Sequence, residues 1–183
     1  MGEKRKEPIV EMTKKDVFKE INETQDFYVN QLYEILNNPQ YKIQHVINFT
    51  SDTGTGKTKM MAKLINKMPD YFFVVTTLSK GQLSYQVEKA LKEDITGDNY
   101  IVFGNSEYTK ATILTGEDIL EMLPKDKPCI WIRDEGHIHT NRFEALLKNK
   151  VDRIINFSAT NQYSDIQCNF MHTMMLRTVE QHC

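Results

Sequence analysis

INFTSDTGTGKTKMM, residues Ile47–Met61, joins an apolar run to a helical pattern through small and hydroxylated residues. Gly54 and Gly56 can take the positive φ angles of a tight loop, and without side chains they let backbone N–H groups approach an anion closely. A helix beginning near Lys57 would add its dipole and its unpaired amides at the same place. The stretch therefore predicts a phosphate-binding loop between a strand and a helix.

Each residue type in this loop fits a task in binding a nucleoside triphosphate. Lys57 would reach the β and γ phosphates, and the Thr58 hydroxyl would be a ligand of Mg²⁺. The usual pattern begins with Gly, whereas this chain has Ser51. The alternative is a glycine turn that precedes Lys-Thr by chance, which is expected in about 1% of chains this long. The predicted cofactor site comprises Ser51, Asp52, Thr53, Gly54, Thr55, Gly56, Lys57 and Thr58.

Apolar runs and helical patterns alternate along the rest of the chain. The strand candidates, rich in β-branched and aromatic residues, are 45–49, 71–77, 99–104, 112–115, 129–133 and 153–159. Helices are expected over 57–67, 81–93 and 141–149, after an amphipathic helix or helix pair within 13–36. This alternation predicts an α/β fold, a mostly parallel sheet covered by helices on both faces. Polar clusters follow four of the strands, and in such a sheet ligands bind beyond the carboxyl ends of the strands.

Length and composition limit the functional classes. The chain has 183 residues, 40% hydrophobic and 26% charged, which suits one ordinary domain. No apolar run approaches the roughly 20 residues of a membrane span, and no signal peptide or myristoylation pattern begins the chain, so we expect a cytoplasmic protein, or host-cytoplasmic if viral. A net charge of −2 gives no basic footprint for nucleic acid. The last cysteines and histidines match no zinc spacing.

A pair of carboxylates follows the apolar run CIWIR. Hydrolysis of a nucleotide needs one carboxylate to hold hydrated Mg²⁺ and another to polarise the attacking water. We assign Asp134 to the metal and Glu135 to the water as general base, with His137 beside them as a further catalytic candidate. The alternative is a solvated acidic turn, which the phosphate loop makes less attractive.

Three motifs in order, SDTGTGKT, DEGH and SAT, resemble motifs I, II and III of the superfamily 2 helicases and translocases, the DEAD/DEAH-like group. Within that group, the chain resembles the type III restriction subunit and related phage helicases. The resemblance covers about residues 20 to 165 and implies a RecA-like ATPase lobe that uses ATP and Mg²⁺. It also implies that Ser158 and Thr160 couple hydrolysis to strand binding.

Weaker matches complete the resemblance. VVTTLSKGQLSYQ is similar to a family segment that contacts the nucleic-acid backbone, and the resemblance implies contacts by Thr76, Thr77 and Gln82. ILTGEDIL is similar to a later family segment that contacts single strands, and the implied contact is Thr115. TQDFYVNQL would supply Gln25 to sense the nucleotide base. In each case the alternative is a helix cap.

Superfamily 2 motors close ATP between two RecA-like lobes, and arginines of the second lobe raise the rate about a thousandfold or more. We expect a helical segment over 1–40, one lobe over 41–165 and a tail over 166–183 that leads to a second lobe, either in a longer chain or in another polypeptide. The prediction is a weak ATPase with a nucleic-acid partner, DNA being favoured over RNA. The alternatives are a nucleotide-dependent binding module and a viral DNA-packaging ATPase.

Overall fold

In the part of the chain that the structure describes, six strands form a sheet in which every pairing is parallel. The structure is a computed structural model that describes residues 13–41, 45–51, 56–77, 82–103, 121–134, 145, 147–158 and 165–168. The strands are β1 (Val46–Ser51), β2 (Phe72–Thr77), β3 (Tyr100–Phe103), β4 (Cys129–Asp134), β5 (Arg153–Ser158) and β6 (Ile166–Cys168). Their order across the sheet is β3-β2-β4-β5-β1-β6. The predicted parallel α/β class is confirmed, and the arrangement is consistent with a RecA-like lobe.

The strand predictions agree with the structure at β1 to β5. β6 was not predicted, because three residues give no periodic pattern, and the predicted strand 112–115 lies outside the described residues. β6 extends the sheet by pairing with the end of β1, where Phe49 is opposite Ile166.

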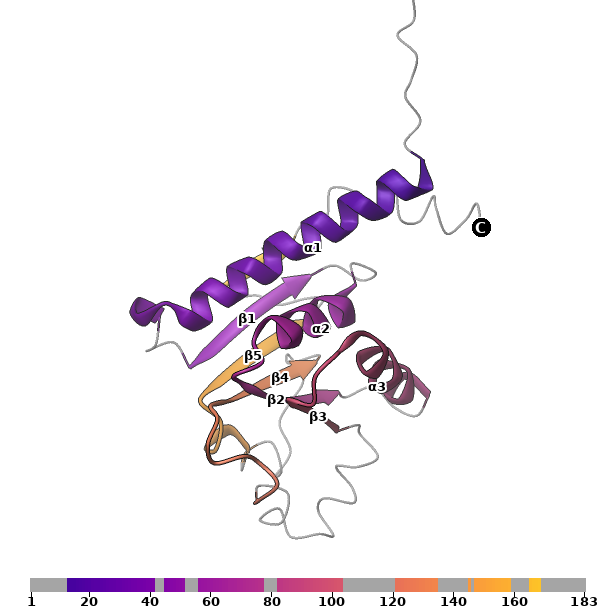
Figure 1. Ribbon diagram of the computed structural model, residues 1–183. Coiled ribbons are helices and arrows are strands. Elements are labelled where there is room, and N and C mark those ends of the chain that lie inside the picture. Colours follow the sequence, from indigo (N-terminus) through magenta and orange to yellow (C-terminus); the bar gives the residue numbers. More distant parts are fainter. Residues whose placement is uncertain are drawn as a thin grey trace, which may run out of the picture.

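Among the described residues, three long helices accompany the sheet: α1 (Lys14–Asn37), α2 (Lys57–Lys67) and α3 (Gln82–Asp94) (Figure 1). α1 is a single helix, whose first turn is closed by a capping box in which Thr13 and Asp16 bond each other's backbone N–H groups. α1 is followed by a short 3₁₀ turn, η1 (Pro39–Tyr41). Of the helix predicted over 141–149, residues 145, 147 and 148 are helical. None of the described helices, α1 included, combines the length and apolarity needed to cross a membrane.

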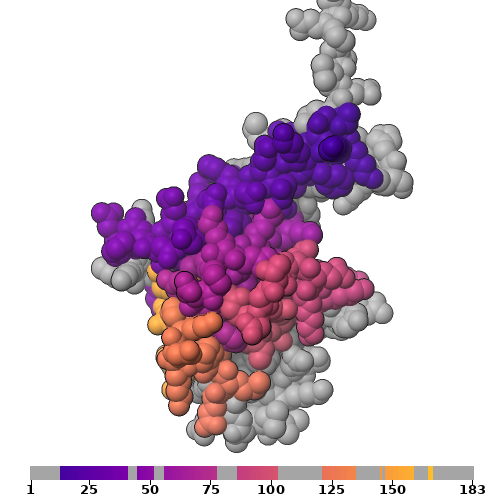
Figure 2. Space-filling model, in the orientation of Figure 1, coloured from indigo at the N-terminus to yellow at the C-terminus, as the bar shows by residue number. Residues whose placement is uncertain are grey.

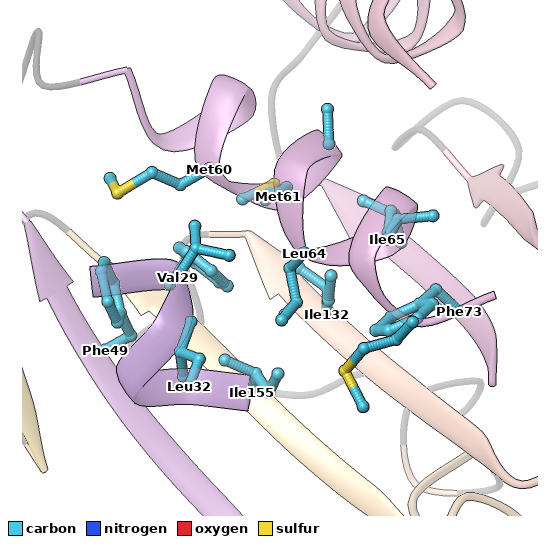
Figure 3. Packing of buried hydrophobic residues seen from close by; sticks show 14 of the residues in the cluster. Val29, Leu32, Phe49, Met60, Met61, Leu64, Ile65, Phe73, Ile132 and Ile155 are labelled. Atoms are coloured by element: carbon cyan, nitrogen blue, oxygen red, sulfur yellow. The ribbon is translucent and has the colours of Figure 1, made fainter. Parts of the chain in front are cut away.

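The main core lies between one face of the sheet and the three helices. Leu32 of α1, Leu64 of α2 and Ile155 of β5 are fully buried there, and Figure 3 shows the two helices directing apolar side chains onto the strands. Burial of a side chain of this size stabilises the fold by about 1.5–3 kcal/mol. Since α1 shares this core with the sheet, the helix belongs to the same packed unit.

A smaller core covers the other face of the sheet. Trp131 and Ile154 pack there with Leu123 and with Leu147, which comes from the helical stretch near 145. Apolar side chains thus pack on both faces of the sheet. The three helices α1, α2 and α3 all lie on one of these faces (Figures 1 and 2). Because both faces are packed with apolar side chains, the polar residues with which the sheet could bind a ligand lie at the ends of its strands.

Candidate nucleotide-binding site

Four neighbouring strands end in polar side chains along one edge of the sheet, which we call the carboxyl edge. In the order of the sheet these last residues are Thr77, Asp134, Ser158 and Ser51. Thr77 is the register partner of Asp134, and Ser158 that of Thr50, the residue before Ser51. Parallel pairing thus brings together clusters that are far apart in the sequence.

Lys57 faces Asp134 at this edge. The ammonium Nζ of Lys57 lies 3.9 Å from Oδ1 of Asp134, and the two side chains are 18% and 11% exposed. A short charge-assisted hydrogen bond would be about 2.7–2.9 Å long, so charge attraction is the main contact between these two atoms. The predicted phosphate-binding cation and the predicted metal-binding carboxylate are therefore neighbours.

Gly56 opens α2 in a left-handed conformation. Its φ is 80°, a backbone angle that residues with a Cβ rarely adopt. Its carbonyl accepts a hydrogen bond from the N–H of Met60 at 3.0 Å. Gly56 has no side chain to cap the helix, and the first turn of α2 contains no acidic residue. The N-terminal amides and dipole of α2 therefore remain suited to an external anion.

Gln25 lies against this glycine. Gln25 is buried on α1, and a Cβ added to Gly56 would collide with its Nε2. Both residues border a cavity of about 440 Å³ between α1, α2 and the end of α3, together with Phe18, Asn22, Lys63 and Asn66. The structure thus brings Gln25 beside Gly56, one residue of the predicted phosphate loop.

Contacts between α1 and α2 hold Gln25 in this place. Nζ of Lys63 donates to Asp26 at 2.7 Å and also to Asn22, while Lys67 donates to Asn30 one helical turn further on. Lysines of α2 thus meet asparagine and aspartate side chains of α1. Figure 2 shows the indigo α1 lying against the magenta α2. These contacts were not foreseen, because the sequence gives no indication of which helices are neighbours.

Ser158 occupies the strand between the two halves of the site. β5 lies between β1, which leads into the phosphate loop, and β4, which ends in Asp134. Ser158 is completely buried, as Ser51 nearly is. The position suits the predicted coupling role of Ser158, which stays a prediction.

Thr76 and Thr77, predicted to face nucleic acid, are both buried. The hydroxyl of Thr76 accepts the indole N–H of Trp131 at 2.7 Å, and the hydroxyl of Thr77 donates to Oδ2 of Asp134 at 3.2 Å. Their hydroxyls thus have internal partners in this structure. The sequence did not reveal the bond to Asp134, since nothing in it says that β2 and β4 are adjacent.

Several predicted site residues lie outside the described part of the chain. They are Asp52, Thr53, Gly54, Thr55, Thr115, Glu135, His137 and Thr160. The side chain of Gln82 is likewise not described. Their roles remain predictions from the sequence.

The donor set fits Mg²⁺ bound together with a nucleotide. Within the described ranges no three His, Cys, Asp or Glu side chains gather as a metal cage. Mg²⁺ is usually held by one or two carboxylates, waters and substrate phosphates, so a complete protein cage is not required. Asp134 and the hydroxyl of Thr58, in the first turn of α2, are the residues that would hold it.

Comparison with known proteins adds no family to this picture. No protein-family model matches the chain, and no curated protein is similar to it at a significant level. The function of the protein must therefore be inferred from the geometry of the site and from the resemblance of the three motifs.

Proposed function

We propose that the protein binds and hydrolyses ATP with Mg²⁺, as the first RecA-like lobe of a superfamily 2 helicase or translocase. The single observation that carries the proposal is that Lys57, at the start of α2, faces Asp134 at the end of β4. A cation at a helix N-terminus and a carboxylate on a neighbouring strand are the two protein groups that a magnesium-bound triphosphate needs.

The chain's own residues would divide the work. Lys57 and the first amides of α2 would bind the β and γ phosphates, while Asp134 and Thr58 would hold Mg²⁺. Held there, the metal would supply positive charge to the phosphate oxygens during transfer. Glu135, the next residue after Asp134, takes the proton of the attacking water as general base, with His137 close in sequence.

The cavity beside Gln25 is the place for the base and ribose. Its volume of about 440 Å³ falls in the usual range of small-molecule pockets. Gly56 is among its lining residues, so a nucleotide whose phosphates lie on the predicted loop would reach it. Phe18 of α1 is half-exposed, also lines this cavity and offers a ring for stacking.

Nucleic acid and a second lobe complete the proposal. The segment after β2 would contact a nucleic-acid strand, with DNA favoured over RNA. Ser158 and Thr160 would couple that contact to ATP hydrolysis. A second RecA-like lobe, in a longer chain or another polypeptide, would supply arginine to the transition state, so this chain alone should turn over slowly.

Single-turnover hydrolysis, with the protein in excess over radiolabelled ATP, tests the proposal. We expect slow, Mg²⁺-dependent hydrolysis that rises with single-stranded nucleic acid, DNA and RNA being compared. In Glu135→Gln the rate should fall by about 100-fold or more while binding of a fluorescent ATP analogue is retained. Glu121→Gln, which neutralises an exposed carboxylate elsewhere, is the matched control.

Two outcomes would count against the proposal. Parent protein that binds no ATP contradicts it entirely. Parent protein that binds ATP but never hydrolyses it, with or without nucleic acid, supports the nucleotide-dependent binding module instead.

A further inference from the structure

Thr77 and Asp134 meet at the carboxyl edge as the last residues of two adjacent strands. Their Cα atoms are register partners, and the Thr77 hydroxyl donates to Oδ2 of Asp134 at 3.2 Å. Thr77 is completely buried and Asp134 is 8% exposed. A hydrogen bond to a buried charged acceptor is among the stronger ones in proteins, because water does not compete for the acceptor.

This contact fixes the direction of the carboxylate. Oδ2 accepts from Thr77, while Oδ1 faces Nζ of Lys57 at 3.9 Å. Rotation about the Cβ–Cγ bond of Asp134 would break the hydrogen bond with Thr77. The hydroxyl therefore keeps Oδ1 of Asp134 directed toward Lys57, on the side where Mg²⁺ would be held.

Thr76 provides an internal comparison. It has the same side chain and nearly the same burial, but its hydroxyl serves Trp131 in the smaller core. Neighbouring residues of a strand point to opposite faces, which explains why the two hydroxyls have different partners. A purely structural hydroxyl and one that touches the proposed metal ligand thus lie side by side in the sequence.

We propose that Thr77 is a positioning residue for the magnesium site, acting through the orientation of Asp134. The inference rests on the proposed function and adds a residue whose predicted contact was with nucleic acid. Partners that orient a metal ligand typically change metal affinity by 10–100-fold when removed. The effect of losing the Thr77 hydroxyl should therefore appear in the Mg²⁺ dependence of nucleotide binding.

Titration of the full chain with a fluorescent ATP analogue tests this, at a series of Mg²⁺ concentrations and in excess EDTA. For Thr77→Val, which replaces the hydroxyl by a methyl group, the Mg²⁺ concentration at half-maximal effect should rise about tenfold or more. Affinity in EDTA should stay within about twofold of the parent, because Asp134 then has no metal to hold. Thr77→Ser should restore the parent's Mg²⁺ dependence.

Thr76→Val is the matched control and should keep the parent's Mg²⁺ dependence whatever it does to stability. If Thr77→Val does not fold, Thr77→Ala and Thr77→Ser form a second pair that differs only in the hydroxyl. The proposal is overturned if the two members of a pair have the same Mg²⁺ dependence. Parent protein that binds no nucleotide removes the proposed function and this inference together, whereas parent-like Mg²⁺ dependence in Thr77→Val removes this inference alone.

Discussion

The two edges of the sheet both carry polar residues, but they use them differently. At the amino edge, where the strands begin, Nδ2 of Asn99 lies 3.0–3.2 Å from the carbonyls of Ile65, Met68 and Tyr71. The carboxylate of Asp152 there accepts the N–H of Cys129 at 2.7 Å. These side chains form hydrogen bonds with backbone groups of neighbouring segments and so stabilise the fold.

At the carboxyl edge the polar groups gather around a glycine-opened helix. Lys57 faces Asp134, and α2 begins without the capping box that closes α1. The difference teaches that a polar residue at a strand end indicates a ligand site only when nearby backbone amides, such as those at the start of α2, are not capped by a side chain. The amino-edge residues should therefore govern stability, and the carboxyl-edge residues nucleotide binding.

Lys57→Ala should have the largest effect of the changes that probe this contrast. Loss of the ammonium should weaken binding of an ATP analogue by about 100-fold, near 3 kcal/mol, because a charge-assisted contact with phosphate disappears. Equilibrium titration measures the change. Lys92→Ala, an exposed lysine of α3, is the control and should bind like the parent. Equal affinity of Lys57→Ala and parent would remove Lys57 from the site.

Asn99→Ala should mainly affect stability. Three carbonyls lose their buried donor, so the free energy of unfolding should fall by about 2 kcal/mol in urea titrations. Affinity for the ATP analogue should be unchanged under folding conditions. Asp98→Ala, at the exposed preceding position, should stay within about 0.5 kcal/mol of the parent. A selective loss of nucleotide binding in Asn99→Ala would abolish the distinction between the edges.

Gly56→Ala should damage the site through the backbone. A Cβ at φ 80° adds about 1–2 kcal/mol of strain and also collides with Gln25. We expect about tenfold weaker binding of the ATP analogue. The double variant Gly56→Ala, Gln25→Ala removes the collision but not the strain, so it should recover binding only in part. Unchanged affinity in Gly56→Ala would show that the loop does not need this conformation.

Arg153→Met should have the smallest effect. Arg153 begins β5 at the amino edge, and its buried Nε and Nη2 atoms have no hydrogen-bond partner within the part of the chain that the structure describes. Burial lowers the pKa of this guanidinium, and Tyr71 partly opposes the shift. An apolar side chain of similar length should be neutral or stabilising by about 1 kcal/mol in urea titrations. A loss of nucleotide binding would assign Arg153 to function instead.

The sequence was sufficient where local patterns carry the information. Apolar runs located β1 to β5, and the boundaries predicted for α2 are those observed, because glycine and the helical period mark its start and its length. The carboxyl edge could be inferred from polar residues that follow four strands. Parallel pairing then made those residues neighbours.

Contacts between distant segments could not be read in this way. Thr77 and Asp134 are separated by 57 positions, and only the strand order makes them partners. Gln25 was expected near a base, but its packing against Gly56 depends on how α1 crosses α2. β6 is stabilised by pairing with β1, and the sequence of a three-residue segment does not predict that pairing.

A crystal structure of the full chain with a non-hydrolysable ATP analogue and Mn²⁺ tests the central claim most directly, since Mn²⁺ is located by its anomalous scattering. The account predicts phosphates against Gly56 and Lys57, with the metal held by Thr58 and Asp134 at the carboxyl edge. Nucleotide bound anywhere else, or a metal held away from Asp134, would contradict it.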